Sequence, residues 1–483
     1  MVARTPAIFC ALVAVCALIP LLPSCSSFRL PIDDPSADGG TDAEGGSISV
    51  IEPPAPCDPS EAPGDGVFVS AAFGLTGAPG TAALPLAKVS DALEIAAARG
   101  VAHVYLDEGT YTESLTLTER HAGIVVSGGW KGSETTWRRD CEENFRAKTI
   151  LESPEPVAVT IKVASSGPTM GFEAMTIATP ALPETPKDTT GTSSIAVLVR
   201  GPASLRISRA RLLAAKGGNG GTASPGEPGA GPLACNGLEG CESGDNGTKG
   251  NDGINGTAVH PSNDHLGDGT DGQDGNPGKN GTAGADGAVK SCRREVTGEC
   301  NTGGGLCDTF DENRQGKKGE CGCGGNGGRG GRRGRGGGAS VALLALGGTI
   351  SIEHTTLFAG GGGDGSVGGQ GGAGVAGGAG KAGASTSCHV TITQSGPTGP
   401  GCTCIINNDQ PAAGGNAGGP GGNGAPGGKG GDGAGGPSYG WVAIGDVRVI
   451  VDEASVLHAE PGGTGSVNGA SAPSLVATLD GGT

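Results

Sequence analysis

Glycine is distributed very unevenly along this chain, and this distribution restricts the possible folds more than any other feature. The sequence has 483 residues and 99 glycines, and about a third of the positions from Gly217 to Gly440 are glycine. No helix or strand core tolerates that density, because glycine packs no side chain and loses the most freedom on folding. Segments poor in glycine flank and interrupt the region. We therefore expect a folded scaffold that carries long glycine-rich insertions.

Composition and charge exclude several classes of protein. Aromatic residues make up 3% of the chain and charged residues 17%, and the formal net charge is −17. So much glycine with so little charge excludes a coiled coil or a helical bundle. The acidic balance excludes a generally basic nucleic-acid binder, so we expect no nucleic-acid partner.

The N-terminus has the features of an export signal. Arg4 precedes an apolar run from Ala7 to Leu22, which is too short to span a bilayer comfortably. The run ends in Leu22-Pro23-Ser24-Cys25, which resembles the lipobox of bacterial lipoproteins and implies lipidation of Cys25. The alternative is an ordinary cleaved signal with an incidental cysteine. By the same resemblance, Ser26 in place of an aspartate favours the outer membrane or cell surface.

Cysteine usage also indicates export. Removing the three cysteines of the first 25 residues from the total of 15 leaves 12, which in an oxidising compartment should mostly form disulfides. Cys57 and Cys141 flank the first structured region and are a natural pair. The other ten fall into two glycine-rich stretches with an odd number in each: Cys235, Cys241, Cys292, Cys300, Cys307, Cys321 and Cys323 in one, and Cys388, Cys402 and Cys404 in the other.

If all twelve pair in this way, at least one bridge joins the two stretches and places them side by side. A zinc site is the alternative for the close pairs Cys321/Cys323 and Cys402/Cys404. Neither pair has the usual two-residue spacer of a zinc ligand pair, so we favour disulfides.

Four glycine-poor segments can be aligned with one another. Each reads as a short apolar strand, a glycine-containing turn, an alternating strand and a third short strand, beginning at Val159, Ile195, Val341 and Trp441. Equivalent alternating positions hold Leu205/Ile207, Ile350/Ile352 and Val449/Val451, and one strand later Leu212, Leu357 and Val456. Strand-sized runs repeated at this spacing indicate a β-solenoid, in which successive coils bury each other's side chains.

The insertions leave equivalent points of successive coils, so they should emerge from one corner of the solenoid, often the binding side. The predicted organisation is a lipoprotein signal peptide with lipobox at 1–25, a Pro/Asp/Gly/Ser-rich tether at 26–63, N-terminal β-helix coils with a capping helix at 64–216, a Gly/Cys-rich insertion at 217–338, a β-helix coil at 339–360, a Gly-rich insertion at 361–437, and C-terminal coils at 438–483.

The opening module predicts a short amphipathic helix from Asp91 to Arg99, with Asp91 as N-cap and Gly100 as the C-terminal stop. Its sequence SDALEIAAARG, followed by VYLDEGTYTESL and SGGW, resembles the opening of right-handed parallel β-helix proteins of the pectate-lyase-like superfamily. The resemblance covers about residues 67 to 151 and implies an all-β, right-handed parallel β-helix whose N-terminal end this helix caps. It says little about activity.

Catalytic signals are weak. Polysaccharide lyases of that superfamily use acidic calcium ligands with a Lys or Arg base on one solenoid face. The candidates are Asp107 and Glu108 in a turn and the arginines of the second aligned segment, namely Arg200, Arg206, Arg209 and Arg211. We see no carboxylates recurring at coil spacing and no acidic partners for the arginines. We therefore interpret these residues as turn acids and solvated strand arginines, and we name no catalytic, cofactor-binding or metal residue.

Several motifs lie in the glycine-rich tracts. A match to G-x-G-x-x-G at 363–368 is expected by chance in such a tract. Residues 427–434 resemble one calcium-binding nonapeptide of the RTX type, without the stacked copies that complete such a site. Residues 269–289 read as Gly-X-Y triplets and indicate an extended, polyproline-II-like loop packed against its neighbours.

Residues 329–338 (RGGRRGRGGG) resemble RNA-binding RGG segments. In an exported acidic chain we interpret them as a solvated loop, or as a contact for anionic surface polymer or lipopolysaccharide phosphate.

We expect a non-enzymatic cell-surface lipoprotein, structural or adhesive, exported by the secretory pathway and lipid-anchored in the outer membrane. Its expected partners are extracellular polysaccharide, surface proteins or another envelope component, and we expect no cofactor, with calcium as the alternative. One rival function is a polysaccharide lyase or glycoside hydrolase of the β-helix superfamily. The other is a low-complexity glycine-rich surface protein with no specific ligand.

Overall fold

The protein is described by a computed structural model, which covers residues 57–59, 63–133, 136–142, 144–231, 249–250, 252–253, 255, 291–292, 314–315, 320, 322–384 and 419–477. All of them belong to one compact unit, Glu52–Thr483. The predicted signal peptide and most of the predicted tether lie outside the described residues. In the part of the chain that is described, no helix is long and apolar enough to cross a membrane.

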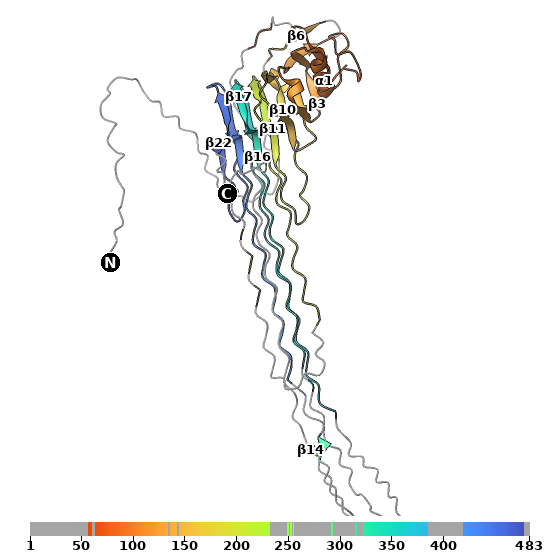
Figure 1. Ribbon diagram of the computed structural model, residues 1–483, viewed down its shortest axis with the longest axis vertical. Helices are drawn as coiled ribbons and strands as arrows, with labels where there is room; N and C mark the ends of the chain where they lie inside the picture. Colours follow the sequence, from red (N-terminus) through yellow and green to blue (C-terminus); the bar gives the residue numbers. More distant parts are fainter. Residues whose placement is uncertain are drawn as a thin grey trace, which may run out of the picture. The chain divides into compact units, whose positions relative to one another are not determined.

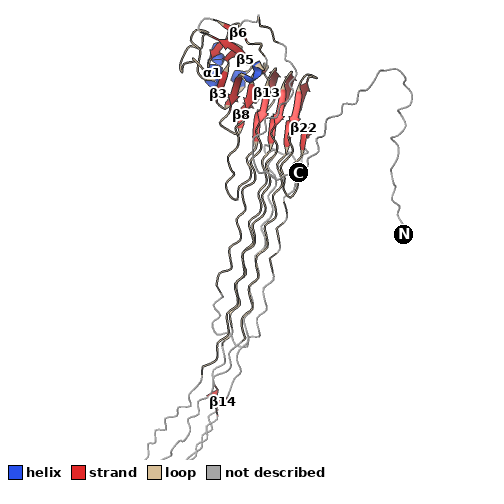
Figure 2. Cartoon of the chain, turned by 180° about the vertical axis from the view of Figure 1, so that it is seen from behind, coloured by secondary structure: helices blue, strands red, loops and turns tan. Residues whose placement is uncertain are grey.

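The strands form three parallel sheets, and each full coil of the chain contributes one strand to each sheet (Figures 1 and 2). Sheet A contains β1 (Val67–Val69), β2 (His103–Asp107), β5 (Val125–Gly132), β9 (Met170–Glu173), β12 (Ser204–Ser208), β17 (Gly348–Glu353) and β20 (Val447–Val451), with β6 (Trp137–Arg139) antiparallel on β5. Sheet B contains β3 (Gly109–Thr112), β7 (Thr149–Glu152), β10 (Thr176–Ala178), β13 (Arg211–Ala214), β18 (Thr356–Ala359) and β21 (Val456–Ala459).

Sheet C contains β4 (Leu115–Leu117), β8 (Val157–Lys162), β11 (Ser194–Arg200), β16 (Ser340–Leu346), β19 (Ser438–Ile444) and β22 (Ser471–Ala477). From β8 onward the chain visits sheets C, A and B in turn, once per coil. This is the right-handed parallel β-helix expected from the sequence. The remaining elements are α1 (Val89–Arg99), the 3-10 turns η1 (Glu119–His121) and η2 (Phe145–Ala147), and a small hairpin of β14 (Ser291–Cys292) and β15 (Arg314–Gln315).

Stacked apolar side chains form the core of the coils. Phe172, Ile207 and Ile352 occupy one register position of sheet A and are fully buried. Each such side chain contributes about 1.5–3 kcal/mol by burial. The register confirms the predicted equivalence of Leu205, Ile350 and Val449.

One predicted equivalence is wrong. Leu357 pairs with Leu457, whereas Val456 pairs with Thr356. From the paired residues Ile352 and Val451 to the paired residues Thr356 and Val456, the second coil has one residue more, so the alignment slips by one residue there.

The helix α1 closes the N-terminal end of the core. Ala92, Leu93 and Ala96 are buried against the first coil, and Gly100 ends the helix in the left-handed conformation at φ 67°. The predicted N-cap is wrong, because the helix begins at Val89 and Lys88 takes the cap position. The Glu113 carboxylate accepts the backbone N–H of Val89 at 2.7 Å and so satisfies the helix N-terminus from another segment.

A disulfide joins Cys57 and Cys141, the pair indicated by the sequence, across 84 positions with their Cα atoms 5.6 Å apart. It ties the residue preceding the first coil to the end of the β5–β6 ribbon.

From β10 onward, the long connections lie at one corner of the β-helix. The links from β10 to β11, β13 to β16, β18 to β19 and β21 to β22 each leave the end of a sheet B strand and return to the start of a sheet C strand. Figures 1 and 2 show the glycine-rich segments extending side by side from this corner. We name them segment I (217–231), segment II (322–338), segment III (360–384) and segment IV (419–437), and together the glycine bundle.

Candidate functional site

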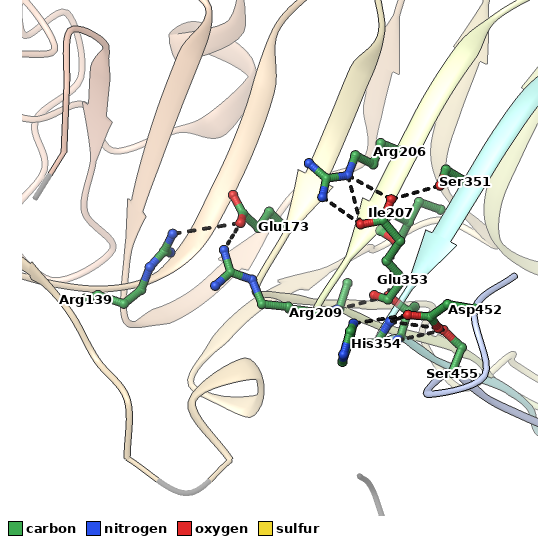
Figure 3. Close-up of polar contacts among 12 residues, drawn as sticks. Arg139, Glu173, Arg206, Ile207, Arg209, Ser351, Glu353, His354, Asp452 and Ser455 are labelled. Atoms are coloured by element: carbon green, nitrogen blue, oxygen red, sulfur yellow. Dashed lines mark hydrogen bonds and ion pairs between the residues drawn. The ribbon is translucent and has the colours of Figure 1, made fainter. Parts of the chain in front are cut away.

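Two features outside the hydrophobic core could carry function. One is a row of charged side chains where sheet A turns into sheet B (Figure 3). We call Glu173, Arg206, Arg209, Glu353, His354 and Asp452 the charged row. The other is the glycine bundle.

An unusual backbone turn positions the charged row. Ala174, Arg209 and His354 are stacked at equivalent positions after β9, β12 and β17, and all three adopt positive φ of 52°, 53° and 48°. Non-glycine residues rarely adopt this conformation. Here each backbone N–H is held by the next coil: Ala174 donates to the Ser208 carbonyl, Arg209 to the Glu353 carbonyl, and His354 to the Asp452 carboxylate at 2.9 Å. The side chains of Arg209 and His354 are thereby placed beside the acids of neighbouring coils.

Ion pairs and hydrogen bonds link the charged row from one coil to the next. The Arg206 guanidinium donates two hydrogen bonds to Glu353, at 3.1 Å from Nε and 2.6 Å from Nη2. Arg209 pairs with Glu173, and His354 Nδ1 lies 3.1 Å from Asp452 Oδ2. Buried Arg139 approaches Glu173 to 4.0 Å and stacks over Trp130, 4.1 Å from the ring centroid.

These contacts correct the prediction that the arginines lack acidic partners and that no carboxylates recur at coil spacing. Glu173 and Glu353 end β9 and β17, and Asp452 directly follows β20 at the same register position. The signal was present in the aligned segments as FEAM, IEHT and VDEA. It was missed because the acids lie at the strand ends, and the partner of Arg206 lies two register positions along the next strand.

Two acids of the row, Glu353 and Asp452, have lowered pKa values. The hydrogen bonds from Arg206 lower the pKa of Glu353, and Glu353 in turn raises the pKa of Arg206. Partial burial alone would raise the pKa of Asp452, but the Ser455 hydroxyl and the His354 N–H bring it below its ordinary value. A general acid at neutral pH needs a raised pKa, which neither of these carboxyls has. The row is suited to fixing turns between coils.

The glycine bundle is built by main-chain hydrogen bonds. Segments II, III and IV donate to one another in a cycle, and the donors recur at every third residue. Segment II donates to IV through Gly325, Gly328 and Gly331; IV donates to III through Gly424, Gly427 and Gly430; and III donates to II through Gly369, Gly372 and Val375, all at 2.7–2.9 Å. A three-residue period is that of the polyproline II helix, which has no internal hydrogen bonds and must find partners elsewhere.

Segment I joins the same network. Gly226 and Gly229 donate to the carbonyls of Gln370 and Ala373 in segment III, at 2.7 and 2.8 Å. Segment II donates back to segment I through the backbone N–H groups of Arg329 and Arg332. Segments I, II and III therefore form a second hydrogen-bonded cycle, which shares segments II and III with the first.

Glycine is required at the interior positions because the backbones approach too closely for a side chain. A Cβ added to Gly328 would overlap the Gly372 carbonyl, and one added to Gly427 would overlap the Arg329 carbonyl. Charged side chains at the periphery, which we call the charged clips, link neighbouring segments through Asp364 and Asp432. Asp432 accepts the Gly368 N–H and the Lys429 ammonium at 2.8 and 2.7 Å.

The bundle accounts for several sequence motifs. The 363–368 match lies in segment III as extended chain, and the 427–434 motif lies in segment IV with Asp432 already bound to Lys429. The two insertions lie side by side, as the cysteine count suggested, and Cys323 is disulfide-bonded. The Gly-X-Y run at 269–289 lies outside the described residues, so its predicted packing stays a prediction.

The other predicted residues carry no apparent site. Asp107 is buried and accepts hydrogen bonds from the Ser70 hydroxyl and the Gly132 N–H, both at 2.8 Å. Glu108 lies in the following turn, and Arg200 and Arg211 lie on β11 and β13. Cys292 lies in β14. The lipidation candidate and the remaining disulfide candidates fall outside the described residues: Cys25, Cys235, Cys241, Cys300, Cys307, Cys321, Cys388, Cys402 and Cys404.

Comparison with known proteins adds little about activity. No protein-family model matches the chain, and no curated protein matches it. Pectin methylesterase PemA from Erwinia chrysanthemi matches with a TM-score of 0.20 and 16% identity, over 31% of this chain and 43% of that one. Pectin methylesterase from Aspergillus niger matches with a TM-score of 0.18 and 15% identity, over 31% and 50%. The chain thus spans half or less of these enzymes, and so distant a likeness transfers no activity.

Proposed function

We propose that this chain is a non-enzymatic, lipid-anchored protein of the cell surface, whose β-helix supports the glycine bundle as a rigid surface for extracellular polysaccharide or another envelope component. The observation that carries the proposal is the division of positions in the bundle. The positions that face a neighbouring segment, one in three in segment IV and two in three in segment III, are mostly glycine, and backbone hydrogen bonds join them across the bundle. Other positions, such as Val367 and Gln370, point outward and are exposed.

A surface of this kind is suited to binding because its strands are already ordered. A ligand that docks on it pays less for immobilising the protein than one that docks on flexible loops. The periodic hydrogen bonds also argue against the rival interpretation of the insertions as low-complexity segments without structure. The charged row offers little to an enzyme, since the pKa values of Glu353 and Asp452 are lowered by their hydrogen bonds, from Arg206 to Glu353 and from Ser455 and the His354 N–H to Asp452.

The structure provides a clean deletion for testing the proposal. The Gly338 N–H donates to the Gly218 carbonyl, and the Gly436 N–H donates to the Gly363 carbonyl, both at 2.8 Å. Removing residues 220–336 leaves Gly218-Asn219-Gly337-Gly338, and removing 365–434 leaves Gly363-Asp364-Gly435-Gly436. Each becomes a four-residue turn that keeps its closing hydrogen bond, with the favoured Asn-Gly or Asp-Gly at its centre.

The experiment exposes the chain beginning after Cys25, with and without both deletions, to a panel of polysaccharides. Retention and the appearance of new reducing or unsaturated ends are recorded, and the melting of the β-helix checks that the deleted chain folds. We expect retention by the intact chain, loss of retention on deletion and no new ends. New chain ends would refute the non-enzymatic role. Undiminished retention by the folded deletion variant would show that the bundle is not the binding surface.

A further inference from the structure

The two ends of the β-helix differ in how they are covered. The helix α1 closes the N-terminal end, whereas β20, β21 and β22 form the last coil, and each of them pairs on one side only among the described residues (Figure 2). Ile352 is fully buried, but its register partner in the last coil, Val451, is only partly buried. Val476, in register with the buried Ala443, is 68% exposed. The C-terminal end therefore presents partly exposed core positions and three strand edges.

The edge strand β20 lacks the features that protect sheet edges. An open row of backbone groups recruits other chains, and natural edge strands are blunted by proline, inward-pointing charge or a bulge. β20 reads VRVIV without a proline, and its register with β17 is continuous. Val449 and Val451 pack against the core, so Arg448 and Ile450 lie on the outer face. Ile450 is 45% exposed, and Arg448 is exposed and forms no ion pair among the described residues.

The backbone of β20 determines how a further strand can pair with it. The Asp452 N–H donates to the Ile352 carbonyl on β17. Backbone groups of successive residues in a strand point to opposite sides, so those of Val449 and Val451 point to the free edge. If two copies of β20 pair antiparallel around Ile450, Val449 of each copy lies opposite Val451 of the other. Each such pair can exchange two hydrogen bonds.

Charge favours this register over the adjacent one. In a pairing around Ile450, Arg448 of each copy lies opposite Asp452 of the other, so opposite charges meet at both ends of the pairing. In a pairing around Val449, Asp446 would lie opposite Asp452, and two like charges would meet instead. The edge of β20 is therefore complementary to itself, which favours a second copy of this chain as its partner.

We propose that two copies of this chain associate through their last coils, with β20 pairing antiparallel with β20 of the second copy around Ile450. This inference does not depend on the proposed function. The interface uses the same surface on both copies and closes at two, because α1 covers the other end of each β-helix. Association extends sheet A across the two copies and brings the partly exposed core positions of both last coils together.

The first test is sedimentation velocity of the chain beginning after Cys25. The variant Ile450→Lys places two like charges opposite each other at the centre of the pairing. The matched control, Val367→Lys, makes the same kind of change at a valine of segment III that is 65% exposed. Melting curves check that each variant folds. As the concentration rises from about 1 to about 100 μM, the unmodified chain and the control should approach twice the monomer mass, whereas Ile450→Lys should weaken association at least about tenfold.

The second test uses cysteine cross-linking to determine the register. Ile450 would lie opposite itself in a non-hydrogen-bonded pair, whose Cα atoms are about 4.5 Å apart and within reach of a disulfide. Ile450→Cys should therefore give a covalent dimer on oxidation. Arg448→Cys, which would lie opposite Asp452, should not.

Several outcomes would overturn the inference. One is a monomer at every concentration, as expected if residues 478–483 cover the edge. Others are equal association of Ile450→Lys and its control, or a mass that continues to rise beyond two copies. Equal cross-linking by the two cysteine variants, or none by either, would overturn the pairing around Ile450. The polysaccharide panel is read separately, so failure of this inference leaves the proposed function standing.

Discussion

The coils of the β-helix bury apolar side chains, whereas the glycine bundle has almost no side chains in its interior. Phe172 and Ile352 are stacked in a fully buried ladder, so hydrophobic burial stabilises the coils. In the bundle, Gly328 and Gly427 bring backbones so close together that no side chain fits between them. Backbone hydrogen bonds and the disulfide of Cys323 must therefore supply the stability that buried side chains supply in the coils. The comparison teaches that one chain can stabilise a scaffold by burying side chains, and can build the surface on that scaffold from glycine, whose backbones pack directly against one another.

The largest effect on stability should come from removing a side chain of the buried apolar stack in the coils. Phe172→Ala should lower the free energy of unfolding of the β-helix by about 3–5 kcal/mol, because the side chain is fully buried and leaves a cavity. Chemical denaturation monitored by circular dichroism measures this. Thr349→Ala, at an exposed position of β17, is the control and should change stability by less than about 0.5 kcal/mol. A loss below about 1 kcal/mol for Phe172→Ala would contradict a stability based on the ladder.

A single methyl group should loosen the bundle and leave the coils intact. Gly328→Ala places a Cβ against the Gly372 carbonyl and should break the hydrogen bonds on either side, costing about 2–3 kcal/mol locally. Gly231→Ala is the matched control, since an added Cβ there meets nothing within 4 Å. Limited proteolysis should cut the bundle of the first variant faster and that of the control at the unmodified rate. Equal rates would show that close backbone approach does not hold the bundle together.

Acid should weaken the bundle. Hydrogen bonds from Thr464 and Lys216 lower the pKa of Asp364 despite its partial burial, and Lys429 and the Gly368 N–H do the same for Asp432. A carboxyl with a lowered pKa stabilises the fold above its unfolded value near 4 and loses that contribution as the pH falls through its folded value. These side chains are about a third exposed, so each contributes at most about 1 kcal/mol.

Proteolysis at pH 7 and at about pH 3 with an acid-active protease checks this expectation. Asp364→Asn/Asp432→Asn should remove most of the additional acid sensitivity of the bundle. A bundle equally resistant at both pH values would contradict the role of the charged clips.

The smallest effect should come from the charged row. Arg206 and Glu353 are 57% and 34% exposed, so a double-mutant cycle of Arg206→Gln and Glu353→Gln should give a coupling energy of about 0.2–1 kcal/mol. The lowered pKa of Glu353 means that this coupling is present at neutral pH and lost on acidification below the unfolded value. A coupling of several kcal/mol would show that the row does more than fix the turns.

The sequence predicted the coils well because their side chains alternate. Leu205, Ile350 and Val449 share one register position, as their alternating pattern indicated. The slip at Leu457 arose in a turn, where one additional residue leaves no periodic trace. The start of α1 was missed for a different reason. Its N-terminal partner, Glu113, comes from a distant segment, and sequence rules for capping consider local partners only.

The sequence predicted less about the candidate sites. Glycine density excluded ordinary strand or helix cores from the insertions, and polyproline-II-like packing was predicted only for 269–289, outside the described residues. Neither observation indicated which segments would donate hydrogen bonds to which. That order depends on how two insertions leave the same corner of the β-helix. The ion pair of Arg206 with Glu353 spans 147 residues and becomes visible only when the two coils are in register. Charge alone could not predict it.

The most direct test of the account is residue-resolved amide hydrogen exchange in segment III. Gly369, Gly372 and Val375 donate to segment II, whereas the exposed residues Val367, Gln370 and Ala373 donate no backbone hydrogen bond among the described residues. The account predicts protection with a period of three residues, with the first set slow and the second fast. Uniformly fast exchange through the segment would contradict a hydrogen-bonded bundle and return the insertions to simple glycine-rich loops.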